Sequence, residues 1–294
     1  MALTTSKITL PREVVTEMVA KAKNGSTIAA LSPSKPKLFA DSTHLVFTPT
    51  AEAEVVAEGA KKSAYEQSLT PIEGKRVKLV TTTRVTDELK WADDDNKLEI
   101  IKNIIDDQTE ALSRAIDYVI YHAINPKTGT ALSGYTSLVS GANAVTSNAD
   151  EAKNIDLMAD ALLDYNINGL ALSREFASAL RKLRVANTGM RLYPEIPLSL
   201  NPGEVDGIAA ATSNTVNGAL AKTATGVRAI MGDFSVIKWG MIRDAYSEII
   251  EYGDPDNAGQ DLKGANQIAY RTESEFVYAV LDPKAFAVLK TAAA

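Results

Sequence analysis

The chain has 294 residues, of which 45% are hydrophobic and 23% charged, with a formal net charge of −6 and no cysteine. This composition predicts a globular protein of one or two domains and excludes the disordered and fibrous classes. The lack of cysteine excludes disulfides, thiolate nucleophiles and thiolate zinc sites, and the negative charge argues against a dedicated nucleic-acid binder.

Residues 1–42 are predicted to form an N-terminal arm. A short amphipathic stretch, residues 11–23, precedes a segment rich in Gly, Ser and Pro, residues 24–36, which cannot hold a regular element for long. Between residues 1 and 40 there are six bases and two acids, a local excess of four positive charges. We favour a solvated, flexible arm over an arm that faces nucleic acid.

Residues 43–86 are predicted to form a long β-hairpin with a polar centre. In its second strand Val77, Leu79 and Val85 alternate with polar residues over most of the run. Little of the hairpin is apolar enough to be buried on both faces, so we expect it to project from the body and to pack on something else. Its charged residues are Glu52, Glu54, Glu58, Lys61, Lys62, Glu66, Glu73, Lys75, Arg76 and Lys78.

The strongest helical pattern covers residues 96–124. Possible N-caps lie at residues 93–95, and Asn125 and Pro126 should stop the helix. Such a helix would be on the order of 40 Å long, a spine for the molecule. The apolar residues at helical spacing are Leu98, Ile101, Ile105, Leu112, Ala115, Val119 and Ala123.

A separate α/β unit is predicted after the loop at residues 128–150. Amphipathic helices are expected at residues 154–166 and 173–185, the second with Ser173 as its N-cap, and a short buried strand at residues 169–172 lies between them. This alternation of helix and strand is typical of a compact α/β unit.

Apolar β segments at residues 229–241 and 246–251 complete the predicted α/β unit, and a loop at residues 253–264 ends it. The last strand, residues 267–281, is long and mixed in polarity. We expect this strand to return to the body that contains the spine helix.

No pattern in the sequence predicts chemistry. His44 and His122 lack the spaced partners of a proton-transfer site, and the acids at residues 93–95 lack the spacing of a calcium loop. Trp91 and Trp239 are isolated, and no phosphate-binding glycine motif occurs. No apolar run reaches the roughly 18 to 20 residues of a membrane span. We therefore expect no catalytic site, cofactor, metal or membrane partner.

The order of these elements resembles the Hong Kong 97-type fold of tailed-bacteriophage major capsid proteins. Four phrases carry the resemblance: VVAEGAKKS at residues 55–63, VKLVTTTRVTDEL at 77–89, GDFS at 232–235 and YRTESEFVYAVLDPKAF at 270–286. The resemblance implies an α+β capsid fold. Its parts are an N-terminal arm (1–42), an extended β-hairpin loop (43–86), a peripheral domain with the spine helix (87–150), an α/β axial domain (151–253) and a return to the peripheral domain (254–294).

The resemblance also implies a function. The chain would be a major capsid protein that assembles into hexamers and pentamers, forming the icosahedral head shell around the phage genome. It would be located in the virion and assembled in the host cytoplasm. Its partners would be further copies of itself, a separate scaffolding protein, a portal, a decoration protein, and packaged DNA contacted non-specifically by the inner face.

Two alternatives remain open from the sequence. The same fold serves encapsulins, whose shells hold a cargo enzyme in place of DNA, so the contents of purified shells would distinguish the two. An enzyme built on the α/β unit would need convergent polar groups in a pocket, and activity screening would test for it. In the capsid interpretation the extended loop lies on a neighbouring subunit, and complementary charge should hold it there.

A subset of the family joins subunits covalently, through an extended-loop lysine that attacks an asparagine beside a glutamate. The resemblance places Asn266 and Glu273 at the latter two positions, and Lys61 or Lys62 in the corresponding part of the projection. The attack would need a desolvated lysine near a carboxylate. The ordinary interpretation is an Asn in a turn, a strand Glu paired to Arg271 or solvent, and two solvated lysines, and we favour it.

Overall fold

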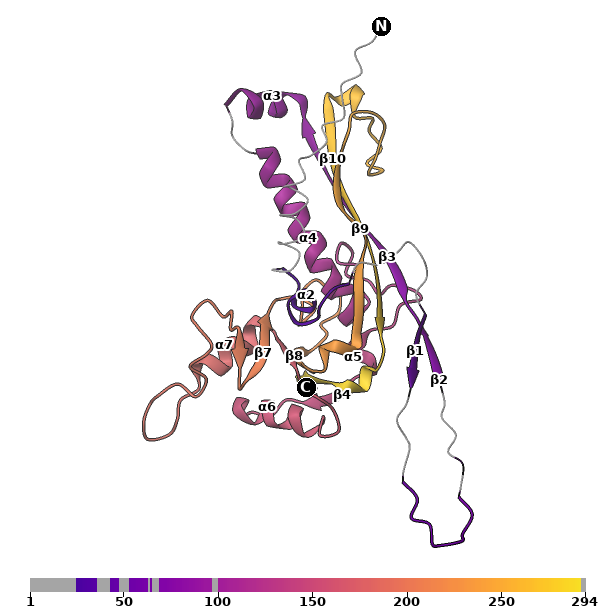
Figure 1. Cartoon of the computed structure of the whole chain (residues 1–294). Coiled ribbons are helices and arrows are strands. Elements are labelled where there is room, and N and C mark those ends of the chain that lie inside the picture. Colours follow the sequence, from indigo (N-terminus) through magenta and orange to yellow (C-terminus); the bar gives the residue numbers. More distant parts are fainter. Residues whose placement is uncertain are drawn as a thin grey trace.

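The protein consists of a long body and an α/β unit, with a narrow projection beside them (Figure 1). The computed structural model describes residues 25–35, 43–47, 53–62, 64, 69–96 and 100–291. Helix α4 and a long antiparallel sheet form the body, and the α/β unit lies at one end of it. This mixture of helix and sheet is the predicted α+β class.

The spine helix α4 extends over Ile100–His122 and follows a separate helix, α3, at Asp87–Asn96. The residues expected to cap the spine, 93–95, lie within α3, so the spine begins later than predicted. It ends at Ala123, whose left-handed conformation (φ 52°) a helix cannot continue, before the predicted stop at Pro126. Its 23 residues correspond to a length of about 35 Å.

The long sheet has the strand order β3-β10-β9 and is antiparallel throughout. Its strands are β3 at Lys75–Thr86, β9 at Ile237–Ile250 and β10 at Gln267–Val280. The prediction that the last long strand returns to the spine is confirmed, since β10 pairs with β3 from Gln267↔Thr86 to Tyr278↔Lys75. Gln108 of α4 ties helix to sheet by donating to the carbonyl oxygen of Tyr270 at 3.0 Å.

Two strands belong to this sheet contrary to prediction. β3 was expected to pair within the hairpin, and β9 was expected in the α/β unit, yet both flank β10. The predicted burial of Val77, Leu79 and Val85 is confirmed, because all three side chains are buried. These side chains pack against the body and not against a hairpin partner. Alternation identifies a half-buried strand and says nothing about which strand it pairs with.

The α/β unit is built on a six-stranded sheet of order β4-β11-β8-β5-β7-β6. The strands are β4 at Asn143–Thr146, β5 at Gly169–Leu172, β6 at Glu204–Val205, β7 at Ile208–Thr212, β8 at Val227–Gly232 and β11 at Phe286–Lys290. Helices α6 at Glu151–Asp160 and α7 at Arg174–Lys182 pack against β11 and β8. Short helix α5 at Leu138–Gly141 precedes β4.

Side-chain alternation divides the sheet between two cores. Leu172, Met231 and Leu289 pack with α6 and α7, whereas Ala171 and Ile230 face the body. Strand β11 lies inside this sheet, so the chain after residue 254 does not return wholly to the long body as predicted. The 3₁₀ turn at Pro283–Ala285 redirects the chain, and the apolar FAVL that follows is buried on both faces.

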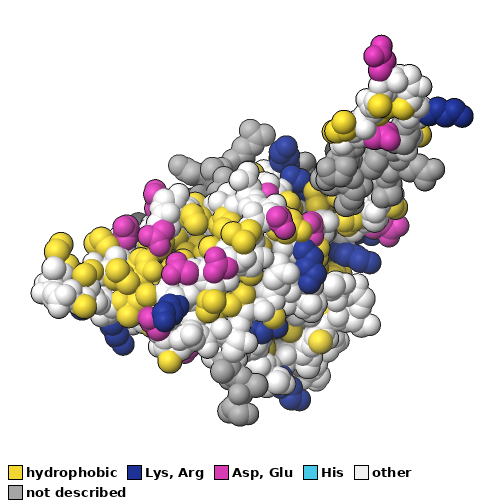
Figure 2. Space-filling view, turned by 90° about the horizontal axis from the view of Figure 1, so that it is seen from below, with side chains coloured by type: hydrophobic (Ala, Val, Ile, Leu, Met, Phe, Trp, Pro, Cys, Tyr) yellow, Lys and Arg dark blue, Asp and Glu magenta, His cyan; other side chains and the backbone are white. Residues whose placement is uncertain are grey.

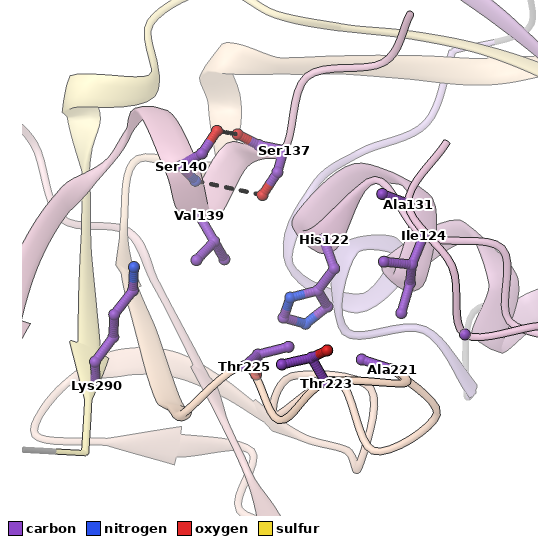
Figure 3. A pocket seen from close by; sticks show the side chains of 11 residues that line it. His122, Ile124, Ala131, Ser137, Val139, Ser140, Ala221, Thr223, Thr225 and Lys290 are labelled. Atoms are coloured by element: carbon purple, nitrogen blue, oxygen red, sulfur yellow. Dashed lines mark hydrogen bonds between the residues drawn. The ribbon is translucent and has the colours of Figure 1, made fainter. Parts of the chain in front are cut away.

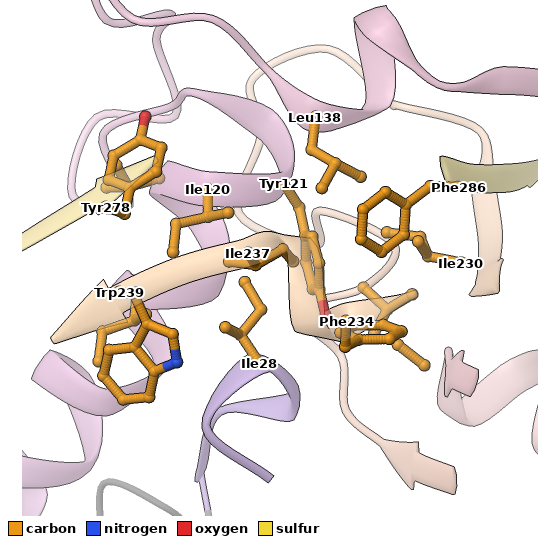
Figure 4. Close-up of a cluster of buried hydrophobic side chains, with 14 of the residues drawn as sticks. Ile28, Ile120, Tyr121, Leu138, Ile230, Phe234, Ile237, Trp239, Tyr278 and Phe286 are labelled. Carbon is orange, nitrogen blue, oxygen red and sulfur yellow. The ribbon is translucent and has the colours of Figure 1, made fainter. Parts of the chain in front are cut away.

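One continuous core joins the long body to the α/β unit (Figure 4). Tyr121 of the spine, Trp239 of β9 and Phe286 of β11 all contribute to it. Ile28, from helix α2 at Thr27–Leu31, is also fully buried there. The segment 26–32 is therefore packed into the core and is not a solvated arm, because TIAAL forms a helical turn capped by Ser26 whose apolar face fills the core.

Candidate assembly surfaces

The projection is a two-stranded ribbon that stands away from the body (Figure 1). Strands β1 at Thr43–Phe47 and β2 at Leu69–Glu73 pair antiparallel, with Thr43 opposite Glu73 and Phe47 opposite Leu69. Only Gly74 separates β2 from β3, which is an edge strand of the long sheet. The ribbon therefore continues this edge strand outward. A two-stranded ribbon is marginal in water, which leaves this one in need of a further packing partner.

The predicted contact charges lie in two places. Glu54, Glu58, Lys61 and Lys62 are exposed on the outer part of the projection, and Glu73, Lys75 and Arg76 are exposed where it joins the body. Glu52 and Glu66 lie outside the described residues. Lys78 belongs to the long sheet, where its Nζ bonds a carboxylate oxygen of Glu273 of the same chain at 2.8 Å.

An exposed apolar face on the projection was missed by the sequence analysis. Leu45 lies opposite Pro71, and because paired residues share a face, Leu45, Leu69 and Pro71 lie together. The side chains of Leu45 and Leu69 are 63% and 48% exposed, and Val55 further out is fully exposed. These residues are visible in the sequence, but that they share one face follows only from the register of the two strands.

Glu273 is the centre of a polar network across the three strands of the long sheet. It accepts hydrogen bonds from Lys78 Nζ at 2.8 Å and from the Tyr246 hydroxyl at 2.9 Å, with Arg271 at 4.0 Å. Burial alone would raise the pKa of Glu273, but the bonds from Lys78 and Tyr246 and the charge of Lys78 hold its pKa below the usual value. Its main partner is thus Lys78, and not Arg271 or solvent as expected.

The four residues of the cross-link hypothesis do not meet within one subunit. Asn266 ends a 3₁₀ turn in the left-handed conformation, and its carbonyl oxygen accepts from the Asp87 N–H at 3.0 Å. Glu273 lies seven residues along β10, about 23 Å away in an extended strand. Lys61 and Lys62 lie on the projection. That subunits are not covalently joined stays a prediction.

The far end of the long body carries an anchored acidic loop. Arg84 of β3 pairs with Asp254 and Asp256 and donates to the carbonyl oxygen of Gln260 at 3.0 Å. The hydrogen bond and charge of Arg84 hold the pKa of Asp256 below its usual value. Arg271 of β10 also donates to the loop, to the carbonyl oxygen of Pro255, so two arginines hold the loop at residues 253–264 against the sheet.

Asp117 joins three separate parts of the chain inside the core. Its carboxylate accepts from the N–H and hydroxyl of Thr27 at 2.9 and 2.8 Å, from the N–H of Ile28 at 3.2 Å, and from the hydroxyls of Ser26 and Thr215. The side chain is fully buried. Burial raises the pKa of Asp117 and the hydrogen bonds oppose that rise. The residue thus fixes the arm segment, the spine helix and a loop of the α/β unit to one another.

A cavity of about 300 Å³ lies beside the end of the spine helix, lined by residues that include His122, Ser137, Ser140 and Lys290 (Figure 3). His122 Nε2 donates toward the carbonyl oxygens of Thr215 and Val216 at 3.0 and 3.1 Å, and burial lowers its pKa. The hydroxyls of Ser137 and Ser140 donate to backbone carbonyls. Neither serine hydroxyl is bonded to the imidazole, so the lining shows no nucleophile–base pair.

The described residues contain neither a metal-binding cluster nor a membrane-spanning helix. Within them, no group of three or more His, Asp or Glu side chains could hold a metal ion. No helix in the described ranges is long and apolar enough to cross a membrane.

Comparisons with known proteins agree along nearly the whole chain. The sequence model described as "Phage capsid family" matches residues 7–291. A solved structure from Mycobacterium phage Ogopogo is 33% identical with a TM-score of 0.83, and the match covers 91% of this chain and 92% of that one. One from Gordonia phage Cozz is 28% identical with a TM-score of 0.73, covering 92% and 87%.

A more distant structure shares the fold. It is described as the capsid of a native GTA particle computed with C5 symmetry, and it is 15% identical with a TM-score of 0.62. The match covers 100% of this chain and 95% of that one. No curated protein matches the chain.

Proposed function

The chain belongs to the phage capsid family as a major capsid protein that forms the head shell, and we propose that it builds this shell from hexamers and pentamers of itself. A neighbour of the same fold is described as a capsid computed with C5 symmetry, which supports five-fold rings. The shell would be assembled in the host cytoplasm and become part of the virion. The chain's role would be structural, without catalysis.

The observation that carries the proposal is the projection. A ribbon that stands away from its own body, with Leu45 and Leu69 exposed on one face and both signs of charge toward its end, has the features of one half of an interface. A neighbouring subunit would cover the apolar face and meet the charges. Each contact is modest, but one such contact per subunit is repeated over the whole shell.

Further partners follow from the same role. A closed shell that fills with DNA needs an entry point, so we propose contact with a portal. We also propose contacts with a separate scaffolding protein and a decoration protein. Packaged DNA would touch the inner face non-specifically, through backbone phosphates.

Shortening the projection tests the proposal. Because Phe47 pairs with Leu69, replacing residues 48–68 with Asn-Gly would close the ribbon with a two-residue turn and leave β1 and β2 in register. Circular dichroism should show a folded subunit, and electron microscopy should show no stable shells. Intact shells of normal stability would show that the projection is no clasp, and a globally unfolded subunit would show that it belongs to the core.

A further inference from the structure

A short hairpin at residues 183–192 follows α7 and is exposed along most of its length. Backbone bonds from Val185 N–H to the Met190 carbonyl (2.9 Å) and from Leu192 N–H to the Leu183 carbonyl (3.1 Å) close it. The side chains of Met190 and Leu192 are 69% and 41% exposed. The hairpin therefore presents an ordered apolar surface to its surroundings.

The same hairpin is strongly basic. Residues 176–194 contain four bases and no acid: Arg181, Lys182, Arg184 and Arg191. Arg184 donates to the carbonyl oxygens of Arg181 and Leu183, at 2.9 and 3.0 Å. Both acceptors are neutral, so these bonds do not neutralise the positive charge of Arg184.

Next to the base of the hairpin lies a surface of opposite charge, which we call the acidic surface and define by Asp156, Glu195 and Asp206. Burial first, and then the charges of Glu195 and Asp156, raise the pKa of Asp206. Burial and the same acids raise the pKa of nearby Tyr193 to about 12. The contributions of Glu195 and Asp156 to the shift of the Asp206 pKa place the three carboxylates within electrostatic reach of one another.

Apolar side chains accompany these acids. Leu157 and Leu163, in and just after α6, are 38% and 82% exposed. Figure 2 shows acidic side chains gathered among hydrophobic ones over the α/β unit. The acidic surface thus matches the hairpin in both respects, apolar contact and opposite charge.

A ring of identical subunits needs two different, complementary surfaces on each subunit. In a closed ring of identical subunits each contact is heterologous, so every subunit must carry both halves of it. Resting on the proposed assembly into rings, we propose that the hairpin at residues 183–192 of one copy docks on the acidic surface of the next copy. This contact closes the capsomer ring and is distinct from the clasp made by the projection.

Charge reversal tests the pairing. One variant is Arg184→Glu with Arg191→Glu, and the other is Asp156→Lys with Glu195→Lys; all four residues are exposed, and circular dichroism checks that each variant folds. Each variant should lower the yield of rings at least about tenfold, because like charges then meet across the contact. The matched control, Arg184→Lys with Arg191→Lys, keeps the charge and should assemble as the unmodified chain does.

Combining the variants identifies the partner. All four reversals on one chain should restore rings, because the charges are again opposite. Mixing the two reversed chains should give rings in which they alternate, and alternation closes only even rings, so native mass spectrometry should detect hexamers and no pentamers.

Three results would overturn the contact. Either reversed variant could assemble as well as the unmodified chain, or the combined chain could stay as defective as its parents, and both would sink this pairing alone. Absence of rings from the unmodified chain under all conditions would instead contradict the proposed assembly, and this contact with it.

Discussion

A single buried carboxylate holds the arm segment to the rest of the molecule. Asp117 receives hydrogen bonds from residues about 90 positions away in both directions of the chain, and two of its donors are backbone N–H groups that can only donate. The sequence could not predict this, because an Asp within an amphipathic helix ordinarily lies on the solvated face. Its burial depends on partners that only the tertiary fold supplies.

Replacing this carboxylate should loosen the arm segment. Asp117→Asn puts an amide N–H₂ group where only acceptors fit, and each donor left unsatisfied costs about 1 to 3 kcal/mol. Urea denaturation should show lower stability, and hydrogen exchange should speed up at the amides of Thr27 and Ile28. Asp107→Asn, exposed on the same helix, is the control and should change stability by less than about 0.5 kcal/mol. Equal behaviour of both variants would contradict the anchoring role.

His122 should make stability depend on pH. Burial lowers its pKa from the ordinary 6.5, so the folded subunit holds the neutral imidazole while the unfolded chain takes up a proton more readily. The free energy of unfolding that the neutral, buried His122 supports is fully present above pH 6.5. It is lost as the pH falls from 6.5 toward the lower pKa of the folded state. The melting temperature between about pH 7.5 and about pH 5 should drop less in His122→Gln than in the unmodified chain.

His44→Gln serves as the matched control for this titration. It removes the other histidine of the chain, and the pH dependence that arises from His122 should persist in it. A pH dependence that disappears with His44 and persists without His122 would show that burial of His122 is not its cause.

Local signals in the sequence were reliable where one residue acts on its near neighbours. Ser173 was predicted as an N-cap, and its hydroxyl accepts from the Phe176 N–H at 3.2 Å. Gly232 opens the phrase GDFS, and a side chain there would collide with the Ala285 carbonyl oxygen, while Asp233 caps the following turn. Such effects extend over a few residues and are visible in the sequence. The polar network of Glu273 joins three strands that are far apart along the chain, so the sequence does not show it.

At the scale of elements, the kinds of structure were predicted better than their partners. The spine, the last long strand and the first half of the α/β unit were predicted as elements, although the spine begins later than predicted and α6 covers Glu151–Asp160 where a helix at 154–166 was expected. β3 and β9 were assigned to the wrong neighbours, because alternation and apolar runs show how a strand is buried without showing beside which strand it lies. β11 was not predicted as a strand. The projection itself was predicted, but its apolar face was not.

That apolar face should contribute more to assembly than the charges further out. Burying a Leu side chain is worth about 1.5 to 3 kcal/mol, whereas an exposed ion pair is worth about 0 to 1 kcal/mol. Leu45→Ser with Leu69→Ser should therefore weaken shells against urea, as followed by light scattering, more than Lys61→Gln with Lys62→Gln. A larger loss of shell stability in the lysine variant would contradict this prediction and favour the charge-based docking expected from the sequence.

At the scale of the whole molecule, local patterns predicted the order of the parts, and the resemblance supplied what they could not, the role of each part in a shell. One core runs from Val77 and Leu79 of the long sheet through Ile120 of the spine to Val288 of the six-stranded sheet. The long body and the α/β unit are thus packed as one piece, and the projection is the part left without a core of its own. The division into arm, extended loop, peripheral and axial domains at the predicted boundaries stays a prediction.

Electron cryomicroscopy of the assembled protein tests the central claim most directly. We expect closed shells of six-fold and five-fold rings in which the projection of each subunit, residues 43–73, lies on a neighbouring chain with Leu45 and Leu69 covered. A protein that stays monomeric under all salt and scaffold conditions, or shells in which the projection contacts only its own chain, would contradict the account.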